Sequence, residues 1–222
     1  MLIKSIAWFG VMLASRCLKL SLLIGSTSSI SLLHITAPLS ASLFSGINGL
    51  FTIAGLILAH LIFPLFPLKL GLPMLVATLS WSVAINKIPK KWLLPANIFC
   101  HFVLPITCMM LFITHPIGNE AWGYSLYWLI PVGIASARFL NFAQHTFFSG
   151  LQSTFVAHAV GSIIWLYTVP MTSGQWLALI PLVAIERFTL AGLMTVGHEA
   201  ITAFTKCIAS IQSKPNTNSV NI

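Results

Sequence analysis

The charged residues that stand inside apolar sequence are the first candidates for chemistry in this chain. Glu186 and Arg187 are adjacent, about ten residues into the apolar stretch that begins near Trp176. A charged side chain at mid-membrane depth costs about 2.5–3.5 kcal/mol, so it usually faces protein, water or an opposite charge. We expect a buried ion pair that specifies packing, a contact to a solute or proton, or side chains that reach the membrane surface. Neighbouring residues on a helix point about 100° apart, so the two need not pair, and Arg138 is a plausible partner for Glu186.

Two histidines lie at similar depth in separate apolar stretches. His158 stands among small residues, which allow close helix approach and direct the imidazole into the bundle. It is either satisfied by one neighbouring hydroxyl or carbonyl group, or it contacts a substrate together with Glu186 and Arg187. His101 follows Asn97 by four residues, so the two side chains share a helix face.

A polar elbow at residues 141–145 separates two further apolar stretches. It is either a plain turn or, together with Gln152, part of a cavity wall. The candidate solute-binding residues of the whole chain are His158, Trp165, Trp176, Glu186, Arg187, Arg138, Gln144 and His101.

Catalytic and cofactor motifs are missing from the sequence. There is no phosphate-binding glycine loop with lysine, no H-E-x-x-H, no G-x-S-x-G and no aspartate at all. No two histidines have the spacing of metal ligands, and the four cysteines form no C-x-x-C pair. We therefore expect no enzyme activity and no cofactor. The one haem hypothesis left open is a b-type cytochrome in which His101 and His158 are the axial ligands.

Composition determines the class of protein that positions these residues. Of 222 residues, 57% are hydrophobic and 6% are charged, whereas soluble domains have about 25% charged residues. A helix needs about 20 apolar residues to cross a membrane. The sequence predicts an all-α integral membrane protein, a bundle of six or seven transmembrane helices. Residues 1–212 form one polytopic domain, and residues 213–222, with Pro215 and three asparagines, are expected to be a disordered tail.

The apolar stretches and their breaks predict the individual spans. The stretch after residue 29 is too long for one span, and Pro38 is expected to divide it. We predict a retained first helix within 1–25, an interfacial or re-entrant piece near 29–38, and spans at 40–63, 68–85, 92–114, 122–140, 151–169 and from Trp176 past Lys206.

Basic residues predict the orientation of the bundle. The net charge is +8, from 11 Lys and Arg against 3 Glu. Such a charge suggests nucleic acid in a soluble protein, but here the basic residues gather in short connections and at helix ends, as in positive-inside orientation. Three lysines at 86–91 place that loop and the C-terminus in the cytoplasm and put 115–120 and 170–175 outside. We expect a multi-pass protein of the cell inner membrane, with the lipid bilayer as its partner and no nucleic acid.

Aromatic residues gather near the ends of two predicted spans. Trp122, Tyr124, Tyr127 and Trp128 form one such cluster. Aromatic belts at the membrane–water interface predict this placement without any function. We therefore interpret most of them as interfacial anchors.

Residues 154–167 are followed by a short outer turn and by residues 176–181, which lead into the helix of Glu186 and Arg187. With these features contributing most, the size, high apolarity and overall helix layout of the chain resemble the substrate-binding (S) component of energy-coupling factor vitamin transporters. The resemblance implies about six helices and a solute site toward the extracellular side, which involves His158, Trp165, Trp176, Glu186 and Arg187. It also implies that a small-residue surface on the first helix, here Gly10 and Ala14, contacts a transmembrane coupling subunit, and that partner ATPases hydrolyse ATP.

These observations favour capture and transport of a small, vitamin-like solute that is anionic or zwitterionic, with Arg187 and His158 as binding residues. A non-catalytic structural or assembly factor of the envelope is the alternative, in which the intramembrane charges hold helices together. A membrane enzyme or b-type cytochrome is the third hypothesis.

Overall fold

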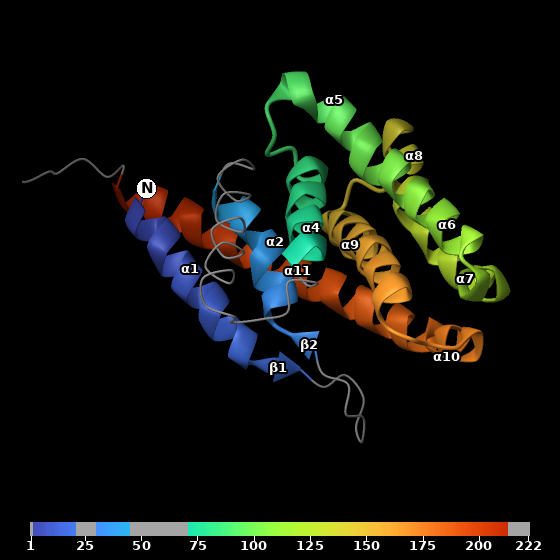
Figure 1. Ribbon diagram of the computed structural model, residues 1–222. Helices are drawn as coiled ribbons and strands as arrows, with labels where there is room; N and C mark the ends of the chain where they lie inside the picture. The colour runs from blue at the N-terminus through green and yellow to red at the C-terminus, as the bar shows by residue number, and fades with distance from the viewer. Residues whose placement is uncertain (1, 21–29, 45–70, 213–222) are drawn as a thin grey trace, which may run out of the picture.

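The computed structural model describes residues 2–20, 30–44 and 71–212, and these are almost entirely helical (Figure 1). Residues 45–63 of the predicted 40–63 span, the start of the 68–85 span and the 213–222 tail lie outside the described residues. The elements are α1 (Leu2–Cys17), β1 (Lys19–Leu20), β2 (Ile30–Ser31), α2 (Leu33–Leu43), α4 (Gly71–Ala84), α5 (Lys90–Ile98), the π-helix η2 (Phe99–Val103), α6 (Leu104–Thr114), α7 (Pro116–Glu120), the 3₁₀ helix η3 (Trp122–Trp128), α8 (Leu129–Phe139), α9 (Thr146–Thr168), α10 (Ser173–Ala178) and α11 (Ile180–Gln212).

Three helices of the described residues are long and apolar enough to cross a membrane. They run over Lys90–Thr114, Thr146–Thr168 and Ile180–Ser210. The first joins α5, η2 and α6 without a break. Helical, membrane-type character is thereby confirmed, while the count of six or seven spans stays a prediction.

Helix α9 lies between α4, α6, α8 and α11 in the bundle (Figure 1). Small residues allow this close packing. The backbone of α11 approaches Gly150 so closely that a Cβ there would lie 2.9 Å from the carbonyl oxygen of Ala191. Three residues later on the same helix, the Ser153 hydroxyl donates to the carbonyl oxygen of Ala77 on α4, at 2.8 Å. The central position of α9 brings it into contact with α4, η2, α6, η3, α8 and α11.

The first helix lies within the predicted 1–25 stretch and occupies only part of it. It ends at Cys17, and Lys19 and Leu20 pair antiparallel with Ser31 and Ile30. The Ser31 hydroxyl donates to the carbonyl oxygen of Ser15 at 3.3 Å, so this carbonyl of the last turn has a partner outside the helix. A helix that continued through residues 18–20 would lose this pairing.

Pro38 does not end a helix, contrary to the prediction. It lies inside α2, with Ala37, Leu39 and Ser40 also buried. Proline removes one backbone hydrogen bond from a helix interior. Burial against α4 and α11 keeps the helix intact around Pro38. The local sequence does not reveal this burial, because the packing partners are distant along the chain.

Two other predicted spans are interrupted for a local reason. The limits of the predicted 122–140 span agree with the helical residues from Trp122 to Phe139, but its first part, η3, is a 3₁₀ helix and only the 11 residues of α8 are α-helical. The predicted helix from Trp176 is broken at Leu179, so that α11 begins at Ile180. Pro131 and Pro181 lie near the start of α8 and α11, and neither can donate the backbone hydrogen bond that would continue the preceding helix.

Candidate functional site

A cavity of about 420 Å³ lies among α2, α4, η3, α9, α10 and α11. This volume is within the range of small-molecule sites, about 300–1,000 Å³. Its wall is mostly apolar, with aromatic, methionine and alanine side chains and a few polar groups. Apolar walls with a small number of polar groups are typical of ligand sites between helices.

The structure brings five of the eight candidate residues together at this cavity. They are His158, Trp165, Trp176, Glu186 and Arg187. The other three, His101, Arg138 and Gln144, do not line it. The binding roles of the five stay predictions, but the structure places them on one wall.

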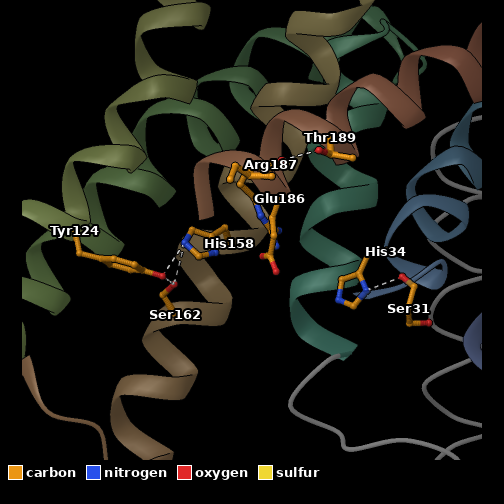
Figure 2. A network of polar contacts seen from close by, with 9 residues as sticks. Ser31, His34, Tyr124, His158, Ser162, Glu186, Arg187 and Thr189 are labelled. Carbon is orange, nitrogen blue, oxygen red and sulfur yellow. Dashed lines mark hydrogen bonds and ion pairs between the residues drawn. The ribbon is translucent and has the colours of Figure 1, made fainter. Parts of the chain in front are cut away.

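Glu186 and Arg187 form an ion pair with each other, with Nη2 and Oε2 at 3.0 Å (Figure 2). The two side chains are only 15% and 12% exposed. The two neighbours therefore pair with each other, and the alternative partner considered for Glu186, Arg138, makes its hydrogen bonds elsewhere. Adjacent Cβ atoms diverge on a helix, but the long arginine side chain folds back and reaches the neighbouring carboxylate.

Arg138 holds three segments at the opposite end of α9. Its guanidinium donates to the carbonyl oxygens of Ala143 and Ala84, both at 3.1 Å, and to the Ser149 hydroxyl at 2.7 Å. Gln144 is exposed and donates to the carbonyl oxygen of Arg138 at 3.3 Å. These contacts join the elbow, the end of α4 and the start of α9, so Arg138 and Gln144 stabilise packing there.

His158 is bonded to a tyrosine that sequence reasoning had assigned to the membrane interface. Its Nε2 lies 2.9 Å from the Tyr124 hydroxyl, which is also 3.3 Å from the Ser162 hydroxyl (Figure 2). Tyr124 is 1% exposed and Trp128 also 1%, so neither is an interfacial anchor. Tyr124 lies 34 residues before His158, and no local pattern connects them.

His34 on α2 is a second cavity residue that sequence reasoning missed. One ring nitrogen, Nδ1, lies 3.0 Å from the carbonyl oxygen of Ser31, and the residue lines the same cavity as Glu186 and Arg187. The sequence feature that singled out His101 and His158 also applies to His34, because it too is a histidine in an apolar stretch. Histidines thus contribute to the cavity wall from both α2 and α9.

Aromatic contacts hold Trp176 in place on the wall. Its ring lies edge-on to Tyr124, with centroids 4.9 Å apart, and edge-on to Phe112 at 5.3 Å. Trp176 is 2% exposed, and its Nε1 has no hydrogen-bond partner among the described residues. Trp165 also lines the cavity but is 47% exposed, which places it at the rim. The wall is therefore rigid around Trp176, with an unused donor.

His101 lies outside the cavity in a complete hydrogen-bond network. Its Nε2 is 2.9 Å from the Ser80 hydroxyl, and its Nδ1 is 2.8 Å from Oδ1 of Asn97, the residue predicted to share its helix face. Both ring nitrogens are engaged, which leaves none for a haem iron, so the haem hypothesis loses one of its two ligands. No group of three His, Cys, Asp or Glu residues in the described part of the chain could hold a metal ion.

No family model, curated protein or solved structure matches this chain. The fold and site define a helical protein whose described residues include three helices fit to cross a membrane and a cavity among the helices. Functional inference therefore depends on the cavity and its residues.

Proposed function

We propose that this protein is a membrane-embedded solute-binding subunit that takes up a small, vitamin-like solute, anionic or zwitterionic. The cavity carries this proposal, because an ion pair and two histidines line it among mostly apolar side chains. Ionisable groups among membrane helices are costly and usually mark a site of function. A purely structural bundle has no need of a cavity beside them.

The orientation proposed from the lysines puts the cavity on the outer side. The loop at 86–91 and the C-terminus are cytoplasmic in this proposal, within a bundle of six or seven spans. The start of α5 and helix α10 lie at opposite ends of the structure (Figure 1). Trp176 of α10 and Met171 before it line the cavity, so a solute enters from outside.

The resemblance to the S component of energy-coupling factor transporters supplies the proposed partners. A transmembrane coupling subunit and ATPases would complete the transporter, since this chain has no nucleotide-binding motif. Gly10 on α1 is exposed, with nothing within 4 Å of an added Cβ, and Ala14 is exposed one turn later. Both leave room for a neighbouring helix, which supports α1 as the coupling surface.

A structural or assembly role is the second candidate. The three hydrogen bonds of Arg138 and the fully bonded His101 favour it, because both groups hold helices together without facing the cavity. In the structural role the ion pair holds helices together, whereas in solute binding it contacts the solute. Under the structural role, substitutions at the cavity would lower the yield of folded protein and would not change the affinity for any solute.

Native mass spectrometry of the protein, purified in mild detergent, tests the proposed function. We expect a retained small molecule that is lost from Arg187→Gln and His158→Gln while both variants stay folded. Lys206→Gln is the matched control, because it removes one positive charge from an exposed position of the same helix. A solute-free wild type, with variants that are merely less abundant, would refute solute binding and support the structural role.

A further inference from the structure

The charge balance of the cavity limits which solutes it can hold. Among the described lining residues, only Glu186 and Arg187 carry full charges when the histidines are neutral, and they neutralise each other. A charge moved from water into protein costs several kcal/mol unless an opposite charge compensates it. A solute with a net charge would leave that charge uncompensated.

Both members of the ion pair keep polar atoms for a further partner. A guanidinium has five N–H donors, and Arg187 gives one, from Nη2, to Glu186 while its buried Nε has no partner among the described residues. The carboxylate of Glu186 accepts through Oε2, and its other oxygen has no hydrogen bond to any described residue. The pair thus offers donors and acceptors side by side (Figure 2).

The aromatic wall adds a donor and a surface for a cation. The indole Nε1 of Trp176 is an unpartnered donor, as described above. Tyr124 and Trp165 line the same cavity, and aromatic ring faces attract ammonium groups. Met74, Ala77 and other apolar side chains of the wall suit an apolar body between the polar ends.

We propose that the solute is a zwitterion of zero net charge, with a carboxylate and an ammonium group on an apolar body. The carboxylate accepts hydrogen bonds from Arg187, and the ammonium group donates to Glu186. Four charges of alternating sign then lie together, and the cavity stays neutral. This inference rests on the proposed function and narrows its solute class from anionic or zwitterionic to zwitterionic alone.

Other charge types fit the wall less well. A simple anion would share Arg187 with Glu186 and leave a net negative charge among the helices. A simple cation would leave a net positive charge for the same reason. An uncharged solute would leave the unused donor of Arg187 and the free carboxylate oxygen of Glu186 without charged partners.

Probes matched in shape and different in charge test the inference on the purified full-length chain. One set is phenylalanine, 3-phenylpropionate, phenethylamine and 3-phenylpropionamide, which are zwitterion, anion, cation and neutral amide on one aromatic body. The second set is leucine, 4-methylpentanoate, 3-methylbutylamine and 4-methylpentanamide. Isothermal titration calorimetry measures each affinity, and native mass spectrometry identifies any retained molecule. We expect the zwitterion of at least one set to bind at least about tenfold tighter than its partners, or the retained molecule to be a zwitterion.

Charge variants give a readout that a merely structural pair would not produce. Glu186→Gln gives the cavity a net positive charge, so the preference should move toward the anion of the set. Arg187→Gln gives a net negative charge and should move it toward the cation. Glu199→Gln and Lys206→Gln change the charge of exposed positions on the same helix and should leave the order unchanged.

The outcomes separate this inference from the proposed function. Tighter wild-type binding of an anion, cation or amide, or retention of a molecule with net charge, overturns the zwitterion and leaves solute binding intact. No binding of any probe and no retained molecule overturns the proposed function and the inference together. If the charge variants do not fold, the relative affinities of the wild-type protein for the four probes of each set test the zwitterion inference on their own.

Discussion

Trp176 and Trp128 form a matched pair that separates solute binding from packing. Trp176 is 2% exposed and Trp128 is 1% exposed, and neither Nε1 has a hydrogen-bond partner among the described residues. Both rings lie edge-on to Phe112 with centroids 5.3 Å apart. Of the two, Trp176 alone lines the cavity. Replacing each with phenylalanine removes the same donor and the same volume.

We predict that Trp176→Phe weakens solute binding and that Trp128→Phe does not. A hydrogen bond to a charged acceptor contributes about 1.5–3 kcal/mol, which corresponds to about 10- to 150-fold in affinity. We infer that the Trp176 N–H donates to the solute carboxylate beside Arg187, so its loss should weaken binding by this amount. The two variants should unfold at similar temperatures, because each loses one indole from the same aromatic cluster.

Titration calorimetry with the retained solute gives the affinities, and thermal unfolding followed by circular dichroism gives the stabilities. Unchanged affinity in Trp176→Phe would refute the reasoning that its donor serves the ligand. An equal loss of affinity in both variants would mean that the cluster acts on the cavity through packing alone.

Two further predictions concern packing around α9. Gly150→Ala should lower the free energy of unfolding by about 1–3 kcal/mol, because the new Cβ meets the Ala191 backbone at 2.9 Å. The control Gly192→Ala, whose new Cβ has nothing within 4 Å, should raise the free energy of unfolding by about 0.5–1 kcal/mol. Thermal unfolding in detergent measures both variants, and shifts of the same sign and size would contradict this prediction. Arg138→Met should lower stability by about 2 kcal/mol through its lost hydrogen bonds without changing solute affinity per folded molecule, and a selective loss of affinity in calorimetry would argue against a packing role.

The long helices could be predicted from sequence because hydropathy is a local property. The predicted spans at 92–114 and 151–169 correspond to helices over Lys90–Thr114 and Thr146–Thr168. Helix ends were less predictable. Pro38 was expected to divide a helix, yet its surroundings in the bundle preserve one. Whether packing compensates a lost hydrogen bond depends on neighbours that the sequence does not specify.

Part of the candidate site could also be predicted, because charged and aromatic residues in apolar sequence are conspicuous. The depth of a residue along a helix does not identify the side chains that it contacts. The incorrect predictions for the site concerned such contacts between helices. Arg138 was considered as a partner for Glu186, but it bonds to the elbow and to α4. Tyr124 was interpreted as an anchor and His34 was not considered, since both join the cavity through contacts distant in sequence.

A structure of the protein in a lipid nanodisc, determined with its retained solute, tests the central claim most directly. The account predicts bound-solute density in the cavity, in contact with Glu186 and Arg187 and next to Trp176. A cavity closed by side chains, or a solute bound elsewhere with the Glu186–Arg187 pair facing lipid, would contradict it.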